Sequence, residues 1–160
     1  MFPFRGLIFD LDGTLADSLE DIAGAMNTTL TAHGLPTHAV EGFKYKVGDG
    51  IEMLVRRSVP EKCALPIPQL VTEYRANYKA TGHAKTQLYP GVAEMLDAVT
   101  ALCVPMAVLS NKRDDFTKDL VRQRLDRWQF RVVAGEREGV PRKPDPTAAL
   151  ELAKALKVPP

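Results

Sequence analysis

The sequence predicts an α/β fold: a parallel sheet flanked by helices and interrupted, after its first strand, by an all-helical insertion. Short apolar runs typical of buried strands recur at residues 7–9, 106–109 and 130–133. Between them, apolar residues recur at helical spacing, and this alternation predicts right-handed crossovers and a parallel sheet. Residues 16–85 carry helical periodicity alone, so we expect them to form a separate domain.

The insertion, residues 16–85, is predicted to contain three helices and no strand. Apolar stripes at spacings of three and four residues mark these helices, and glycine or proline follows each of them. The apolar stripe of the first helix runs from Leu15 to Leu30, and Asp17 or Ser18 is expected to cap the start of this helix. The other two predicted helices cover about residues 50–58 and 70–81. The rest of the chain, residues 1–15 and 86–160, is predicted to form the core domain that carries the sheet.

Three further helices are expected in the core domain. They begin near Val92, Asp114 and Pro146, in the connections that flank the second and third strands. Asp114 and Asp145 are the predicted N-caps, because an aspartate carboxylate can accept hydrogen bonds from the N–H groups of the first turn. Trp128, the lone tryptophan, is expected in the core.

Length and charge argue against several classes of protein. The 160 residues suit one compact domain or a small core with an insertion, and the net charge of +1 creates no strong field for nucleic acid or a membrane surface. No apolar run has the length of a transmembrane helix, and Pro3 and Arg5 interrupt the apolar start that a signal peptide would need. Cys63 and Cys103 lack metal-type spacing, so we interpret them as reduced packing residues of a cytoplasmic protein.

The strongest functional signal directly follows the first strand. Asp10 and Asp12 are two residues apart, so in a strand-like backbone their side chains point to the same side. Gly13 permits a sharp turn, and Thr14 adds a hydroxyl beside the same site. Two carboxylates this close need a lysine or a divalent cation to remain ionised together. One suits nucleophilic attack and the other proton transfer, although Asp-Gly-Thr alone is also ordinary turn chemistry.

Two further polar sets are expected at the same edge of the sheet. Ser110 and Asn111 follow the second strand, and Lys143 precedes Pro144 and a predicted helix. Ligands of open α/β sheets collect at the carboxyl ends of the strands, where these residues and Asp10 would meet. Taken singly, a polar strand end or one lysine is more simply interpreted as solvated surface.

Together these sets resemble three motifs of the haloacid dehalogenase superfamily in its phosphatase form. The first motif is Asp-x-Asp-Gly-Thr, here Asp10 to Thr14. The resemblance implies that Asp10 becomes an aspartyl-phosphate and that Asp12 is the general acid and base. It also implies a Mg²⁺ cofactor, held by the Asp10 carboxylate and the Asp12 backbone carbonyl. Since the dehalogenases themselves lack the second aspartate, Asp12 favours phosphoryl transfer.

The other two motifs imply the phosphate-binding residues. Ser110, followed by Asn111, resembles the second motif, whose hydroxyl holds a phosphoryl oxygen, and Thr14 is expected beside them. Lys143 resembles the third-motif lysine, which neutralises the phosphoryl group and steadies the nucleophile. Residues 12–18 most closely resemble the phosphoglycolate phosphatase group, which implies a small acid phosphate such as 2-phosphoglycolate as substrate. Sugar-phosphate phosphatases and phosphomutases of the superfamily share the scaffold and remain alternatives.

The resemblance also assigns the two predicted domains. Residues 1–15 and 86–160 would be a Rossmann-like core with a truncated parallel sheet. Residues 16–85 would be a mobile helical cap that closes over the site and excludes water. The expected partner is therefore a small phosphorylated metabolite, with neither nucleic acid nor membrane.

One feature of the superfamily is missing from the sequence. The fourth motif is one or two acidic residues after a fourth strand, but no Asp or Glu follows Glu151. The first strand would then lie at an exposed, apolar sheet edge, and a homodimer could form there. The chain is interpreted as a fragment or shortened relative of a phosphatase, with weak Mg²⁺ binding and slow or absent hydrolysis. The alternative from another class is a non-catalytic module that binds a partner by strand addition. A phospho-accepting signalling receiver fits poorly, since receivers do not insert such a helical segment.

Overall fold

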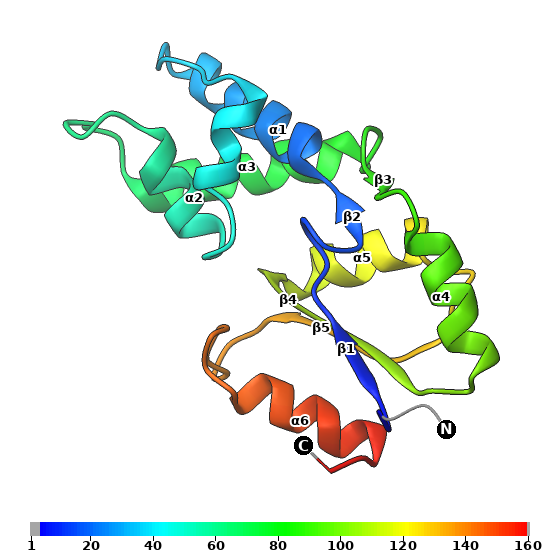
Figure 1. Ribbon diagram of the computed structural model, residues 1–160. Helices are drawn as coiled ribbons and strands as arrows, with labels where there is room; N and C mark the ends of the chain where they lie inside the picture. Colours follow the sequence, from blue (N-terminus) through cyan, green and yellow to red (C-terminus); the bar gives the residue numbers. More distant parts are fainter. Residues whose placement is uncertain (1–3, 160) are drawn as a thin grey trace. The chain divides into compact units, whose positions relative to one another are not determined.

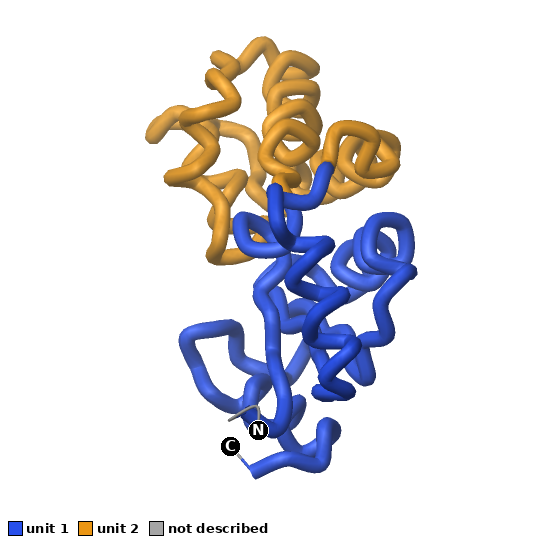
Figure 2. The backbone as a smooth tube through the Cα atoms, turned by 45° about the vertical axis from the view of Figure 1, so that its right-hand side comes forward, with its two compact units in different colours: residues 1–16, 87–160 blue, residues 17–86 orange. Residues whose placement is uncertain are grey.

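The computed structural model describes residues 4–159 (Figure 1). The chain divides into two compact units: residues 1–16 with 87–160, and residues 17–86 (Figure 2). The two domain boundaries expected from the sequence, after residues 15 and 85, each lie one residue before the observed boundaries. Within the described residues, no helix is both long enough and apolar enough to cross a membrane.

The first unit is built on a three-stranded parallel sheet (Figure 1). Its strands, in sheet order, are β1 (Leu7–Phe9), β4 (Met106–Arg113) and β5 (Phe130–Glu136). Leu7 pairs with Met106, and Met106 pairs with Phe130 on its other side, so β4 is central. The predicted α/β class with a parallel sheet is therefore confirmed.

The central strand runs beyond its apolar sequence pattern. The apolar residues of β4 end at Leu109, but after an irregularity the pairing with β5 resumes at Arg113, opposite Glu136. Ser110 to Arg113 therefore remain part of the strand where the sequence predicts its end. This extension decides which side chains reach the site.

β1 lies at one edge of this sheet. Its only strand partner among the described residues is β4, and Ile8 at its middle is 37 % exposed. An apolar side chain on an unpaired edge strand is a feature that proteins usually protect. The expectation of an exposed edge at the first strand agrees with this arrangement.

Helices cover both faces of the sheet (Figure 1). They are α4 (Val92–Ala101) and α5 (Asp114–Arg124) on one face, and α6 (Thr147–Leu156) on the other. Successive β4 residues alternate between these layers, as side chains of a strand do. Val108 is buried in a cluster with Leu120 of α5, whereas Ala107 is buried in a cluster with Leu152 of α6. Trp128 belongs to the first cluster and is 7 % exposed, as predicted for a core residue.

Two helix starts differ from their predictions. Asp145 accepts a hydrogen bond from the Thr147 N–H at 2.9 Å, but α6 begins at Thr147, with Pro146 as its N-cap. Asp114 is the first residue of α5 rather than its cap, and its Oδ1 accepts a hydrogen bond from the Gly135 N–H at 2.9 Å. Short acidic side chains bind nearby backbone N–H groups in several geometries, so their presence locates a helix start only approximately.

The second unit is helical. Its elements are α1 (Leu19–Ala32), the 3-10 helix η1 (Val40–Tyr45), α2 (Ile51–Ser58) and α3 (Ile67–Thr81). The helix α1 begins at Leu19 with Ser18 as its N-cap, which agrees with the predicted cap at Asp17 or Ser18, while Leu15 packs into the core of the first unit. The short helix η1 was not predicted, while α2 and α3 correspond to the two later predicted helices.

A two-stranded sheet lies where the chain passes from one unit to the other. It pairs β2 (Ala16–Asp17) with β3 (Gln87–Leu88), and neither strand belongs to the main sheet. The prediction that residues 16–85 contain no strand is therefore wrong at its first two residues. A two-residue strand is too short to show any periodicity in the sequence.

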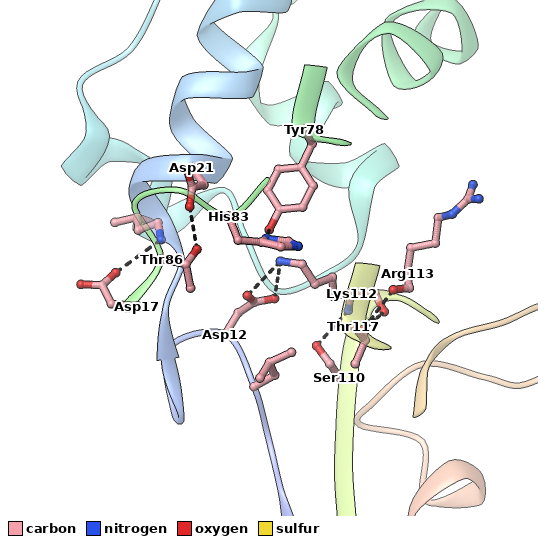
Figure 3. A network of polar contacts seen from close by, with 12 residues as sticks. Asp12, Asp17, Asp21, Tyr78, His83, Thr86, Ser110, Lys112, Arg113 and Thr117 are labelled. Atoms are coloured by element: carbon pink, nitrogen blue, oxygen red, sulfur yellow. Dashed lines mark hydrogen bonds and ion pairs between the residues drawn. The ribbon is translucent and has the colours of Figure 1, made fainter. Parts of the chain in front are cut away.

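A buried carboxylate joins the two ends of the helical unit (Figure 3). Asp21 in α1 is 3 % exposed, and its oxygens accept hydrogen bonds from the Lys85 N–H at 3.1 and 3.3 Å. The Thr86 hydroxyl donates a third hydrogen bond to Asp21, at 2.7 Å. These contacts fix the last residues of the unit against its first helix.

The two cysteines are separate free thiols. Cys63 is partly buried in the helical unit, whereas Cys103 is exposed after α4, with a φ of 55°. The interpretation of both as packing residues is therefore wrong for Cys103. Cysteine is usually buried, but the turn that ends α4 leaves this one on the surface.

Candidate functional site

The carboxyl end of β1 places Asp10 and Asp12 on a tight turn. Leu11 lies between them and is fully buried, and its carbonyl oxygen accepts a hydrogen bond from the Leu15 N–H at 3.0 Å. Gly13 has a φ of +78°, in the left-handed region that favours glycine. The buried leucine and the glycine together fix the backbone from which both carboxylates extend.

Asp10 faces the ammonium group of Lys143. The Lys143 Nζ lies 2.7 Å from Asp10 Oδ1 and donates a 2.9 Å hydrogen bond to the Leu109 carbonyl oxygen of β4. Asp10 Oδ1 also accepts a 2.7 Å hydrogen bond from the Leu11 N–H. The Asp10 side chain is still 45 % exposed, so a ligand can reach it. Two predicted site residues from distant parts of the sequence are thus in direct contact.

Asn111 holds the loop that carries Lys143. Its Nδ2 donates to the Lys143 carbonyl oxygen at 3.0 Å, and its Oδ1 accepts from the Lys143 N–H at 2.9 Å. A side-chain amide has both donor and acceptor capacity, so it can pair with both backbone groups of one residue. Asn111 is expected from the sequence to bind phosphate, and in the structure its amide holds the backbone of the site lysine.

Ser110 and Thr14, the two expected hydroxyl ligands, lie in different surroundings. Ser110 is 4 % exposed, and its Oγ accepts a 3.1 Å hydrogen bond from the Lys112 N–H. Thr14 is exposed in the turn after β1, where its N–H donates to the Leu11 carbonyl oxygen at 3.3 Å. Because a hydroxyl can accept and donate at once, Ser110 can still donate to a ligand oxygen.

Lys112 is a site residue that the sequence did not reveal (Figure 3). Its Nζ donates to Asp12 Oδ1 at 2.9 Å and to Asp12 Oδ2 at 3.1 Å. The lysine side chain is 7 % exposed and the aspartate side chain 23 %. A signal existed, because Lys112 stands two residues after Ser110 and such residues share one side of a strand. The sequence pattern ends the strand at Leu109, which hid this relation.

The site therefore contains two carboxylate–lysine pairs. Lys143 contacts Asp10, and Lys112 contacts Asp12. Two close carboxylates need positive charge beside them to remain ionised together. The structure provides one lysine for each, from two different segments of the chain.

The oxygen donors at this site suit a hard divalent cation with few protein ligands. Mg²⁺ is usually held by one or two carboxylates, with water and substrate phosphate completing its shell. The family resemblance assigns this role to the Asp10 carboxylate and the Asp12 backbone carbonyl, while Lys112 engages the Asp12 carboxylate. The described part of the chain contains no group of three or more His, Cys, Asp or Glu side chains that could hold a metal.

In this α/β protein, a parallel sheet carries a charged carboxylate site at the end of an edge strand, and a helical unit follows that strand. The chain belongs to the haloacid dehalogenase-like hydrolases, because the model of that family matches residues 7–160. This match confirms the family resemblance seen in the sequence.

Several known proteins are similar to this chain over most of its length. A phosphoglycolate phosphatase of Pseudomonas syringae pv. tomato is 37 % identical over 161 residues, which cover 96 % of this chain and 58 % of that protein. One from Nitrosospira multiformis is 33 % identical over 166 residues, covering 99 % of this chain and 72 % of that protein. A solved structure of a predicted phosphoglycolate phosphatase from Haemophilus somnus 129PT has a TM-score of 0.87 and 25 % identity, covering 99 % of this chain and 74 % of that one. The chain thus spans between about half and three quarters of these relatives.

Proposed function

We propose that this chain carries the nucleophile, the acid–base residue and the phosphate-binding residues of a phosphomonoester hydrolase. In the first step, an Asp10 carboxylate oxygen attacks phosphorus, and the bond from phosphorus to the leaving oxygen breaks. The product is an aspartyl-phosphate on Asp10, and the leaving oxygen takes a proton from Asp12. The exposed Asp10 carboxylate beside the Lys143 ammonium, at 2.7 Å, is the observation that carries this proposal.

In the second step, water hydrolyses the aspartyl-phosphate. Asp12 accepts a proton from the water as its oxygen bonds to phosphorus, and the bond between Asp10 and phosphorus breaks, releasing phosphate. This restores the Asp10 carboxylate and the proton on Asp12. One residue can serve as acid and then as base because it lies beside the same phosphorus in both steps.

Lys143, Ser110 and Thr14 are proposed to bind the phosphoryl oxygens. The Lys143 ammonium would offset the negative charge of the transferring group, and the two hydroxyls would donate hydrogen bonds to it. Mg²⁺, held by the Asp10 carboxylate and the Asp12 carbonyl, would supply further charge neutralisation. With a single protein carboxylate on the ion, we expect weak Mg²⁺ binding.

The proposed substrate is a small acid phosphate such as 2-phosphoglycolate. The names of the curated relatives support this choice. The helical unit, residues 17–86, is proposed to act as a cap that excludes water from the site and helps to select the substrate.

The test of this function is Asp10→Asn in a version of the chain completed by a fourth strand with its acidic pair, assayed with 2-phosphoglycolate and Mg²⁺. The substitution should lower turnover by about a thousandfold or more while the chain still folds, because it removes the nucleophile. Asp126→Asn, at an exposed position after α5, is the matched control and should keep full activity. Removal of Mg²⁺ by a chelator should also abolish turnover. Wild-type activity in Asp10→Asn would exclude the covalent mechanism.

A second candidate function rests on β1. Its edge is unpaired among the described residues, and Ile8 is partly exposed there. A partner chain could add a strand at this edge, which would make the protein a binding module rather than an enzyme. This alternative predicts that no phosphomonoester is hydrolysed, whereas the first candidate requires turnover that depends on Asp10.

A further inference from the structure

We infer that Lys112 is a positioning residue, which holds the Asp12 carboxylate in place for proton transfer. The inference rests on the proposed phosphatase function and extends it to a residue outside the three sequence motifs. The Lys112 Nζ contacts both oxygens of Asp12, at 2.9 and 3.1 Å. A contact to both oxygens restricts rotation of the carboxylate, which a contact to one oxygen would permit.

Burial makes this contact persistent. The Lys112 side chain is 7 % exposed, and a buried ammonium group is unfavourable unless an opposite charge or other acceptors compensate it. Asp12 supplies that opposite charge in its ionised form, which is the form that accepts a proton from water in the second step. The contact with Asp12 therefore stabilises this buried lysine by more free energy than a surface ion pair would give an exposed lysine.

The backbone of Lys112 is fixed from several directions (Figure 3). The Lys112 N–H donates to Ser110 Oγ at 3.1 Å, and its carbonyl oxygen accepts a 3.0 Å hydrogen bond from the fully buried Thr117 hydroxyl. On β5, Gly135 approaches so closely that a Cβ there would lie 2.4 Å from the same carbonyl oxygen. Side chains supported in this way hold a site geometry better than unsupported ones.

The two lysines then have separate roles. Lys143 contacts Asp10, the proposed nucleophile, and it comes from the loop before α6. Lys112 contacts Asp12, the proposed acid and base, and it comes from the end of β4. Loss of Lys112 should therefore leave the attack by Asp10 possible but misplace the group that activates water for the second step.

The two steps can be separated with p-nitrophenyl phosphate. Its leaving group departs without protonation, so formation of the aspartyl-phosphate needs little from Asp12. Hydrolysis of the intermediate still needs Asp12 to accept a proton from water. In Lys112→Met, we expect a rapid burst of p-nitrophenol, followed by a steady rate lowered about 10- to 100-fold. Acid quenching should show phosphate accumulated on Asp10. A fraction of misfolded protein would lower burst and steady rate together.

A matched control and a double variant complete the test. Lys154→Met, at an exposed position in α6, should behave as wild type in both phases. In the Asp12→Asn background, Lys112→Met should cause no further loss of the steady rate, because the carboxylate that it positions is already gone. Independent, multiplicative losses in the double variant would overturn the inference.

The outcomes also separate this inference from the proposed function. If wild type turns over and Lys112→Met has the same steady rate as wild type, the positioning role alone would be overturned. A burst and accumulated phosphate in Lys112→Met would support both. Absence of turnover and of any burst, both in this chain and in a version completed by a fourth strand with its acidic pair, would overturn the proposed function, and the inference that rests on it would fall as well.

Discussion

Single charged residues around the site are fixed by backbone groups as well as by opposite charges. Lys143 Nζ contacts both Asp10 and the Leu109 carbonyl oxygen. The Asp114 carboxylate likewise accepts a 2.9 Å hydrogen bond from the Gly135 N–H and lies 2.6 Å from the Lys118 Nζ. Hydrogen bonds that involve a charged group are stronger than neutral ones. Each such residue should therefore contribute measurably to stability.

Asp114→Ala should lower the free energy of unfolding by about 1–3 kcal/mol near neutral pH, because the Gly135 N–H loses its acceptor. Burial acts to raise the pKa of the Asp114 carboxyl, but hydrogen bonds from Gly135 and Lys118 outweigh it, and the pKa lies below the usual 3.8. A carboxyl group whose pKa is lower in the folded state than in the unfolded state stabilises the fold at pH values above its unfolded-state pKa. This stabilisation is lost as the pH falls through the folded-state pKa.

Urea unfolding of wild type and Asp114→Ala, near neutral pH and again in acid well below the usual 3.8, measures this effect. The difference in unfolding free energy between the two proteins should narrow in acid. Asp126→Ala, at an exposed position, provides a comparison that should stay close to wild type at both pH values. A constant difference would show that the Asp114 charge is not the source of the stability.

The arrangement of elements depends on a close approach between β5 and the start of α5. Gly135 of β5 lies against Lys112, Asp114 and Thr117, and a Cβ at Gly135 would come within 2.4 to 2.6 Å of atoms in all three. Two of these atoms belong to the backbone, which cannot move aside as a flexible side chain can. Glycine is therefore needed at this position for packing rather than for an unusual φ.

Gly135→Ala should destabilise the chain by about 2 kcal/mol or more, since the added methyl group overlaps backbone atoms. Thermal unfolding monitored by circular dichroism measures the change. Gly24→Ala in α1 is the matched control, because nothing lies within 4 Å of its added Cβ. That control should be neutral or more stable by up to about 1 kcal/mol, as alanine favours a helix. Equal melting temperatures for the two variants would contradict the packing argument.

At the scale of the whole molecule, the site is assembled by the sheet. Asp10 and Asp12 follow β1, Ser110 and Lys112 belong to β4, and Lys143 lies in the loop before α6. Parallel pairing of β1 with β4 brings these ends together, since the strands run in the same direction. The same topology leaves β1 at the sheet edge.

The exposed edge of β1 should make the isolated chain self-associate as its concentration rises. The reason is that an unpaired strand with a partly exposed apolar residue, here Ile8, offers backbone groups for pairing with a second copy. Sedimentation at increasing concentrations measures this association. Ile8→Lys should reduce it, because a charge on an edge strand opposes pairing, whereas Leu150→Lys, at an exposed position on α6, should not. A monomer at every concentration would rule out pairing at this edge.

The sequence by itself determined the α/β class, the parallel strands, the helical insertion and the association of Asp10 with Lys143. These features are legible because apolar periodicity and polar residues at strand ends are local patterns. Only the tertiary structure decided the contact of Lys112 with Asp12 and the two-residue strand β2. The lysine reaches Asp12 because β4 continues past its apolar residues, and that continuation depends on pairing with β5 rather than on the residues of β4.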